Sequence, residues 1–396
     1  MRVQFDDRSF DYQTLRALAY APFGGSEAGE VFVTTERIPG GDTEAWYEEW
    51  RATAQGVERL AAEAADEGRD RTARGGYLRA HTYYRTAEFF LSSDDPRRPA
   101  TYDRSRECFR EGADRLDTPV ERLAIPYEDT ELPGYLFRPA ASTDGPHPTV
   151  VCLGGFDSLA EELYFLCRVP EALARGYAVV LFDGPGQGAP LREQGLTARP
   201  DWEHVVAPVL DHLEDRPGLD DSRVGVVGVS FGGYYAPRAA AFDDRIGAVV
   251  AFDHMHDLWR ASAGENPLLA RVFARLPDAV VNGAAALGER TSVEARWLMS
   301  NSRWVFGVET AAELQRTLRE YSLTDVAHRI ECPTLVLAGE DDHFVPLSLA
   351  SEFADLVSGP TTLRVFTTEE GAGEHCQVGN LGLATGEIYD WLDATL

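Results

Sequence analysis

A serine, an aspartate and a histidine with the properties of a catalytic set occur in that order along the chain. The serine, Ser230, lies in the Gly-Val-Ser-Phe-Gly sequence 228–232, between a valine-rich run and a helix-forming stretch. This context predicts a nucleophile elbow, a sharp strand-to-helix turn in which small flanking residues let the backbone bend and expose the hydroxyl. The helix would aim its N-terminus at negative charge that develops there. The alternative is a glycine-rich turn with a solvated serine.

A serine nucleophile needs a base, and the base needs an acid that orients it. His375 is the candidate base, because it follows the last predicted strand in a glycine-containing loop, 371–376. Asp342 is the candidate acid and Asp341 the alternative, since both follow the predicted strand Thr334–Ala338. Active-site residues collect at the carboxyl ends of parallel strands. We expect the other carboxylate to be a turn or cap residue.

Backbone N–H groups near Ser230 are expected to form an oxyanion hole. One donor would be Phe231, the residue after the nucleophile, and the second would come from the loop that follows the predicted strand Thr149–Leu153. In that loop Phe156 is the first candidate and Gly155 the second. The two glycines at 154–155 allow close approach of the backbone to a substrate. The alternative is an ordinary Gly-Gly turn.

Two further motifs resemble binding sites. The Asp-Gly-Pro-Gly-Gln-Gly sequence 183–188 contains proline and no clear helix start, so it indicates a rigid turn beside the site, not a dinucleotide site. The sequence 254–257, His-Met-His-Asp, has metal-ligand types but no matching distant ligands. We therefore expect no metal. Asp253 or Asp257 would instead position the substrate or assist the catalytic set.

Composition excludes several classes of function. The 396-residue chain has a net charge of −28 and a sequence pI near 4.7, so it lacks the basic surface that nucleic acid requires. It contains no lysine, which excludes a Schiff-base lysine, a pyridoxal phosphate anchor and a P-loop. Five scattered cysteines fit reduced thiols. No run approaches the roughly 20 apolar residues of a membrane helix.

These observations set the expected partners and location. We expect a soluble cytoplasmic protein, because the first ten residues are charged and lack the apolar segment of a signal peptide. The expected partner is a small-molecule substrate, with no cofactor, no nucleic acid and no membrane. The oligomeric state is left open, a homodimer included.

The pattern of apolar residues in the sequence changes near residue 120. Residues 1–120 are predicted to form a helical domain, with helices at Glu44–Glu67, Thr72–Leu91 and Tyr102–Leu116. Beyond it, short apolar runs alternate with helical patterns, as in a parallel sheet buried on both faces. The candidate strands are Glu121–Tyr127, Gly134–Arg138, Thr149–Leu153, Ala178–Phe182, Arg223–Val229, Ala248–Phe252, Thr334–Ala338 and Thr362–Phe366.

The expected helices between these strands are Ser158–Arg175, Trp202–Leu213, Phe231–Phe242, Leu347–Leu356 and Leu383–Leu392. The first two strands are expected to pair antiparallel. The segment 257–328 is too long for an ordinary connection. We interpret it as a helical insertion, a lid over the active-site end of the sheet; ordinary crossover helices are the alternative.

Taken together, the elbow, the turn at 183–188, the acid loop 339–346 and the late histidine resemble the α/β-hydrolase fold family. Three segments, 79–90, 154–158 with 161–162, and 374–376, resemble more narrowly the family of 2,6-dihydroxypseudooxynicotine hydrolase and of fungal hydrolases that shorten heptaketide pigment precursors. The resemblance spans nearly the whole chain. It implies an eight-stranded, mostly parallel sheet with helices on both faces in residues 121–396, and an N-terminal helical cap formed by residues 1–120.

The resemblance also implies site residues. It supports Ser230 as nucleophile, Asp342 as acid and His375 as base. That family uses an additional pocket glutamate, for which Asp257 and Glu265 are the candidates here.

The implied reaction is hydrolysis of a carbon–carbon bond next to a ketone, on an aromatic or polyketide-like molecule. Hydrolysis of an ester, lactone or thioester by the same triad is the first alternative. Non-hydrolytic natural-product tailoring, bond formation included, is the second. Four aromatic residues are candidates to sandwich a flat substrate, with plain helix packing as the alternative. They are Tyr83, Tyr84, Trp259 and Trp304.

Overall fold

A computed structural model describes residues 1–118, 120–140, 146–214, 216–263 and 267–396. The chain divides into two compact units. The helical unit comprises Met1–Val120 and Ala285–Asn301, and the sheet unit comprises Glu121–Ala284 and Ser302–Leu396. The division near residue 120 lies where the sequence analysis placed a domain boundary. Residues 285–301, however, belong to the expected insertion and group with the N-terminal helices. The roles of cap and lid stay predictions.

One eight-stranded sheet organises the sheet unit, in the order β1-β2-β4-β3-β5-β6-β7-β8. The strands are β1 (Val120–Tyr127), β2 (Thr130–Phe137), β3 (His147–Leu153), β4 (Ala178–Phe182), β5 (Leu219–Val229), β6 (Ala248–Phe252), β7 (Thr334–Gly339) and β8 (Thr361–Phe366). Strands β3 to β8 pair in parallel, and β2 pairs antiparallel with β4. A two-residue turn joins β1 and β2, as in a hairpin. The predicted mostly parallel sheet is confirmed.

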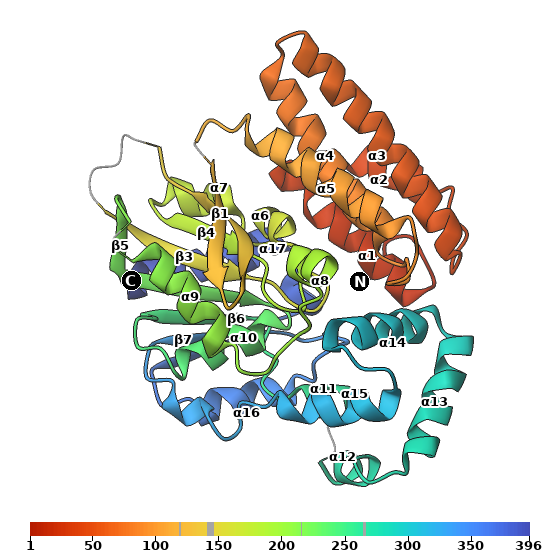
Figure 1. The fold of residues 1–396 in the computed structure, drawn as a ribbon, viewed down its shortest axis with the longest axis vertical. Helices are drawn as coiled ribbons and strands as arrows, with labels where there is room; N and C mark the ends of the chain where they lie inside the picture. The colour runs from red at the N-terminus through yellow and green to blue at the C-terminus, as the bar shows by residue number, and fades with distance from the viewer. Residues whose placement is uncertain (119, 141–145, 215, 264–266) are drawn as a thin grey trace. The chain divides into compact units, whose positions relative to one another are not determined.

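Helices cover both faces of this sheet (Figure 1). Helices α6 (Ala160–Leu166), α7 (Val169–Ala174) and α17 (Leu381–Thr395) lie on one face, where the Tyr389 hydroxyl donates to the Cys167 carbonyl. On the other face lie α9 (Glu203–Leu213), α10 (Gly232–Ala240) and α16 (Ser348–Leu356). Strands β4 and β6 are buried along their whole length. Apolar runs without alternation form such strands because both of their faces are covered.

The helical unit contains α1 (Arg8–Ala19), α2 (Ala28–Thr35), α3 (Thr43–Asp66), α4 (Asp70–Glu88) and α5 (Arg98–Ala113). Its core is aromatic: the ring of Trp46 lies 4.7 Å from Phe10 and 5.7 Å from Trp50. Helices α3 and α4 approach closely, because a Cβ atom at Gly76 would lie 2.7 Å from that of Ala61. The unit therefore has its own hydrophobic core, independent of the sheet.

The segment after β6 is helical. It contains α11 (Leu258–Ala263), α12 (Pro267–Phe273), α13 (Asp278–Thr291), α14 (Val293–Phe306) and α15 (Ala311–Thr317). The short helix α8 (Gly188–Gln194) follows the turn at 183–188. Within the described residues, no helix combines the length and the apolar composition that a bilayer-spanning segment requires.

Candidate active site

Ser230 stands at the tight turn between β5 and α10. Its φ angle is +59°, a left-handed conformation that is rare for residues other than glycine. Its N–H donates to the Phe252 carbonyl at 2.7 Å. A Cβ atom at Gly228 would lie 1.9 Å from the Gly232 carbonyl oxygen, and one at Gly233 would lie 1.7 Å from that of Asp253. Both positions thus require glycine for the turn to close.

The structure brings the three predicted catalytic side chains into one hydrogen-bonded chain. Ser230 Oγ lies 2.8 Å from His375 Nε2, and His375 Nδ1 lies 2.6 Å from Asp342 Oδ2. Asp342 Oδ1 also accepts the backbone N–H groups of Phe344 and Val345. Asp341 Oδ2 instead accepts the Thr368 hydroxyl at 2.6 Å. Of the two aspartates left open by the sequence, Asp342 is the one bonded to the imidazole.

Burial and charge shift the pKa values of Asp342 and His375 in this series of hydrogen-bonded side chains. Burial disfavours the ionised form of Asp342, but the charge of His375 and the hydrogen bonds from His375, Phe344 and Val345 lower its pKa to about 2. Burial likewise disfavours imidazolium, but the negative charge of Asp342 raises the pKa of His375 well above its usual value. This arrangement suits an imidazole that takes up the serine proton during a reaction.

The loop 154–156 lies directly against the elbow. A Cβ atom at Gly155 would lie 2.7 Å from the Phe231 backbone nitrogen and 2.9 Å from the Ser230 Cβ. The backbone of Gly155 therefore borders the space next to the Phe231 N–H, where an oxyanion would bind. The ring of Phe156 packs 6.1 Å from that of Phe306. The roles of Phe231, Phe156 and Gly155 as oxyanion donors stay predictions.

The turn at 183–188 supports this loop. The Gln187 side-chain amide donates to the carbonyls of Gly154 at 2.6 Å and Gly155 at 3.3 Å, and its oxygen accepts the Gly184 N–H at 3.0 Å. Asp183 Oδ1 accepts the Ala160 N–H at 2.8 Å. These contacts fit the rigid turn that the sequence analysis expected beside the site. The specific role of Gln187 was missed, because its partners are carbonyls of a distant loop.

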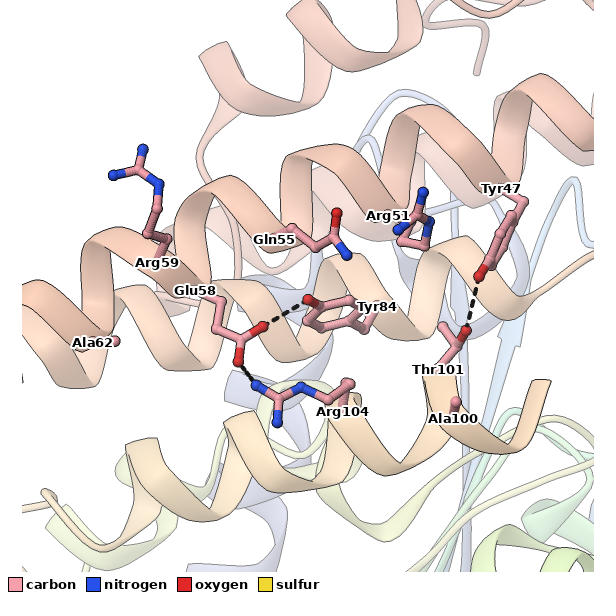
Figure 2. Close-up of a pocket in the computed structure, with 10 residues that line it drawn as sticks. All are labelled: Tyr47, Arg51, Gln55, Glu58, Arg59, Ala62, Tyr84, Ala100, Thr101 and Arg104. Atoms are coloured by element: carbon pink, nitrogen blue, oxygen red, sulfur yellow. Dashed lines mark hydrogen bonds and ion pairs between the residues drawn. The ribbon is translucent and has the colours of Figure 1, made fainter. Parts of the chain in front are cut away.

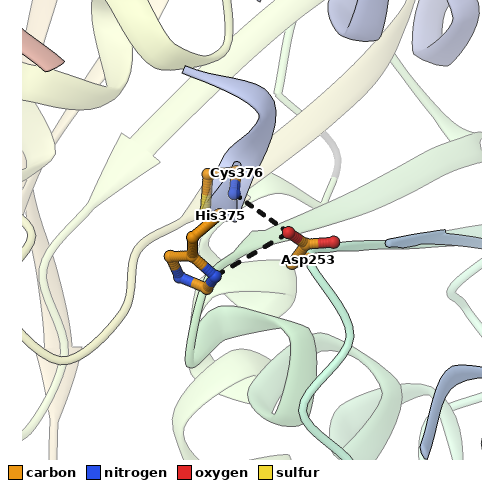
Figure 3. Close-up of side chains that lie close together, drawn as sticks. All are labelled: Asp253, His375 and Cys376. Atoms are coloured by element: carbon orange, nitrogen blue, oxygen red, sulfur yellow. Dashed lines mark hydrogen bonds and ion pairs between the residues drawn. The ribbon is translucent and has the colours of Figure 1, made fainter. Parts of the chain in front are cut away.

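Asp253, at the end of β6, is a second buried carboxyl beside the histidine (Figure 3). Its Oδ2 lies 3.7 Å from His375 Nδ1 and accepts the Cys376 N–H at 2.9 Å. One potential ligand atom of each of these three residues falls within 4.8 Å of the others, a spacing compatible with a metal ion. Because His375 Nδ1 already bonds to Asp342, we read the cluster as support for the histidine.

The neighbouring candidates occupy other positions in the sheet unit. Asp257 Oδ1 accepts the Arg260 N–H in the first turn of α11, and its Oδ2 accepts the Ser322 hydroxyl. Trp259 has the Arg319 guanidinium over its ring at 5.2 Å, and Trp304 has that of Arg192 at 5.1 Å. Substrate contacts of these residues stay predictions. Glu265, the other candidate for the pocket glutamate, lies outside the described residues.

Tyr83 and Tyr84 belong to the helical unit, and both side chains are buried. The Tyr83 hydroxyl donates to Glu30 at 2.6 Å, and that of Tyr84 donates to Glu58 at 2.6 Å. Tyr84 also lines a groove of about 540 Å³ between α3, α4 and α5 (Figure 2). The remaining groove residues are Tyr47, Arg51, Gln55, Glu58, Arg59, Ala62, Ala100, Thr101 and Arg104. The predicted substrate contact of the two tyrosines stays a prediction.

An aromatic cluster next to the elbow was not singled out from the sequence. The ring of Phe231 lies 5.9 Å from Phe306 and 5.4 Å from Tyr321, and these two rings are 5.2 Å apart. Phe306 and Tyr321 are separated from the elbow by more than 70 residues of sequence. Only the fold of the helical segment between β6 and β7 brings them to Phe231, so no local sequence pattern marks them.

Comparison with known proteins supports this fold. Residues 35–276 match the family described as "Esterase FrsA-like". The chain belongs to this FrsA-like family. Its solved relatives include the 2,6-dihydroxy-pseudo-oxynicotine hydrolase, which superposes with a TM-score of 0.76 at 26% identity over 96% of this chain and 95% of that one. The FrsA-like chain therefore has the α/β-hydrolase fold, as the resemblance implied.

Fungal hydrolases match the FrsA-like chain along nearly its full length. Hydrolase acrC of Aspergillus aculeatus is 39% identical over 97% of this chain and 96% of its own. The 20-hydroxy-prefusarin hydrolase FUS2 of Gibberella moniliformis is 38% identical over 100% of this chain and 98% of its own. The chain is thus an enzyme of the α/β-hydrolase class, similar to hydrolases from fungi.

Proposed function

We propose that this enzyme is a serine hydrolase that cleaves a carbon–carbon bond next to a ketone in an aromatic or polyketide-like molecule. The observation that carries the proposal is the bonded chain from Ser230 Oγ through His375 to Asp342, set beside the Phe231 N–H. A hydroxyl, an imidazole and a buried carboxylate in this order supply a nucleophile, its base and the group that orients the base.

In the proposed reaction, each of these groups has one role. Ser230 Oγ attacks the ketone carbon while His375 Nε2 takes the hydroxyl proton, and the ketone oxygen becomes an oxyanion held by the Phe231 and Phe156 N–H groups. Asp342 keeps Nδ1 protonated and stabilises the imidazolium. The carbon–carbon bond then breaks, and the leaving carbon takes the bonding electron pair and the proton from His375. Water, activated by His375, releases the acid from Ser230, so one water is consumed.

The choice of a ketone rests on the full-length likeness to the 2,6-dihydroxy-pseudo-oxynicotine hydrolase and to the fungal hydrolases. The family description favours a second candidate, hydrolysis of an ester by the same residues. Attack, oxyanion and acyl-enzyme are common to both reactions. They differ in the leaving group, because carbon must be protonated as it leaves whereas an alkoxide is a better leaving group.

A substrate panel separates the two candidates. The purified enzyme is incubated with aryl ketones, β-diketones and matched aryl esters, and the products are identified by mass spectrometry. Release of a carboxylic acid together with the protonated carbon fragment supports the proposal. Turnover of the esters alone would contradict carbon–carbon cleavage. The Ser230→Ala variant is the control for background hydrolysis.

A further inference from the structure

Asp253 contacts the segment that carries the histidine at three points. Its Oδ2 accepts the Cys376 N–H at 2.9 Å and the Gln377 side-chain amide at 3.0 Å, and it lies 3.7 Å from His375 Nδ1 (Figure 3). The side chain is completely buried. Asp253 is therefore tied to the residues directly after the base, while Asp342 lies closer to His375 Nδ1, at 2.6 Å.

The same part of the chain also holds the nucleophile. The Phe252 carbonyl accepts the Ser230 N–H at 2.7 Å, and the Asp253 carbonyl lies so near Gly233 that no side chain fits there. The end of β6 thus contacts the elbow through its backbone and the histidine loop through the Asp253 side chain. A change at this side chain is therefore expected to alter the position of His375 relative to Ser230.

The histidine loop needs such a restraint because its backbone is unusual. Cys376 has a φ angle of +51° and Gln377 one of +47°, which side-chain-bearing residues adopt only when surrounding contacts hold them. Asp253 accepts a hydrogen bond from the backbone of one and from the side chain of the other. Without an acceptor at this position, these two buried donors would be left unpaired.

Two buried carboxyl groups, those of Asp342 and Asp253, lie beside the His375 imidazole. If both were ionised, two negative charges would be buried next to one imidazole. Asp342 has the stronger support for ionisation, because it accepts His375 Nδ1–H and two backbone N–H groups. A second buried carboxylate would be uncompensated, and like charges at close range are not both ionised. Asp253 Oδ1 has no hydrogen-bond partner among the described residues. The titratable groups that face Asp253 are Asp342, His375 and Cys376.

Burial, reinforced by the charge of Asp342, raises the pKa of Asp253 well above its usual value. In the protonated form, Oδ2, which accepts the two donors, would be the carbonyl oxygen and Oδ1 would carry the proton.

We propose that Asp253 is a positioning residue that works as an uncharged carboxylic acid. It fixes the loop 375–377 against the end of β6 and so sets the position of His375 beside Ser230, while Asp342 alone supplies the negative charge. The inference rests on the proposed serine mechanism. It assigns different requirements to the two aspartates: hydrogen-bond geometry at position 253 and charge at position 342.

Asparagine substitutions separate these requirements. A carboxamide has the shape and the hydrogen-bonding groups of a neutral carboxylic acid, so Asp253→Asn keeps both bonds to Oδ2. Asp342→Asn removes the charge and puts the imidazole in the wrong tautomer, a change that costs about 10⁴-fold in rate in serine proteases. Asp253→Leu keeps the approximate size and removes the acceptor, so a displaced base is expected to lower the rate by about 10²-fold.

The readout is the rate at which diisopropyl fluorophosphate labels Ser230, together with p-nitrophenyl acetate hydrolysis as a function of pH. We expect diisopropyl fluorophosphate to label Asp253→Asn at a rate within about threefold of the wild-type rate. This change is smaller than the tenfold that corresponds to about 1.4 kcal/mol. The acidic limb of the pH profile of p-nitrophenyl acetate hydrolysis is expected to be unchanged. Loss of 10²-fold or more in Asp253→Asn, or an active Asp342→Asn, would overturn the inference. So would a shift of the acidic limb to lower pH in Asp253→Asn, because removing a negative charge lowers the pKa of His375.

Folding and the underlying mechanism are controlled separately. Thermal unfolding identifies a misfolded Asp253→Leu, and the two asparagine variants decide the question without it. A folded Asp253→Leu that labels at the wild-type rate would also overturn the positioning role. If wild-type Ser230 takes up no label, the proposed function fails and this inference fails with it. Labelling of the wild type combined with loss in Asp253→Asn defeats the inference alone.

Discussion

The Cα of Gly155 faces the Phe231 backbone nitrogen so closely that a Cβ atom there would lie 2.7 Å from it. The added methyl group would also meet the Ser230 Cβ at 2.9 Å. Either the loop 154–156 or the elbow must then move. Absence of a side chain at Gly155 thus keeps open the space in which the oxyanion is expected to form.

Gly155→Ala is therefore expected to lower kcat by about 10²-fold, the loss seen when one oxyanion donor is removed. The control is Gly386→Ala in α17, where an added Cβ meets nothing within 4 Å and a helical alanine is favourable. Steady-state hydrolysis of p-nitrophenyl acetate measures both variants, with thermal unfolding as a check. Equal activity of Gly155→Ala and wild type would contradict the placement of the oxyanion hole.

Gln187→Leu tests whether the Gln187 side-chain amide holds the loop 154–156 in place. Loss of the amide leaves the carbonyls of Gly154 and Gly155 without this donor, so the loop is expected to loosen and kcat to fall by about tenfold or more. The matched control is Gln194→Leu, because Gln194 is exposed and bonds to Glu131 at the surface. If Gln187→Leu and Gln194→Leu have the same kcat, the hydrogen bonds of Gln187 to the loop 154–156 do not contribute to catalysis.

The two adjacent aspartates after β7 are expected to differ sharply. Asp342→Asn removes the carboxylate bonded to His375 and is expected to reduce kcat/KM by about 10⁴-fold. Asp341→Asn changes a side chain that bonds to Thr368, and we expect it to stay within about threefold of wild type, as surface changes away from a site usually do. The reverse order of effects would identify Asp341 as the acid.

The pH dependence of kcat/KM reports the protonation of His375 in the free enzyme. Below its pKa the imidazole is protonated and cannot accept the Ser230 proton, so activity rises with pH through that pKa. Because Asp342 raises the pKa of His375, the acidic limb is expected above the ordinary histidine value of 6.5. A limb at or below 6.5 would show that the imidazole does not experience the charge of Asp342.

The strands were predictable from the sequence because their signal is local. Runs such as Val224–Val229 and Ala248–Phe252 are short and apolar without alternation, as is typical of a strand buried on both faces. The helix expected at Ser158–Arg175 is instead two helices, because Arg168 adopts a φ angle of +45°. That break depends on tertiary contacts, including the Arg168 bond to Thr385, which the sequence pattern does not contain.

The contacts that complete the site were less predictable. Elbow, acid loop and histidine loop each have a local sequence pattern, and hydrogen bonds join the three side chains as the pattern implies. In the helical unit, helix α1 has no such local pattern. Its buried Asp11 accepts hydrogen bonds from the backbone N–H groups of residues 3–5, and these contacts are not visible in the sequence. Tyr83 was a candidate for substrate contact or for plain helix packing, and its hydrogen bond to Glu30, 53 residues away, has no local sequence signal.

The most direct test of the central claim is the site of covalent labelling by diisopropyl fluorophosphate. The enzyme is labelled, digested and analysed by mass spectrometry, with Ser230→Ala and the surface variant Ser222→Ala treated in parallel. The account predicts one adduct on the peptide that contains Ser230, retained in Ser222→Ala and absent, together with activity, in Ser230→Ala. An unlabelled Ser230 in active enzyme, or a Ser230→Ala variant that still turns over substrate, would contradict the covalent serine mechanism.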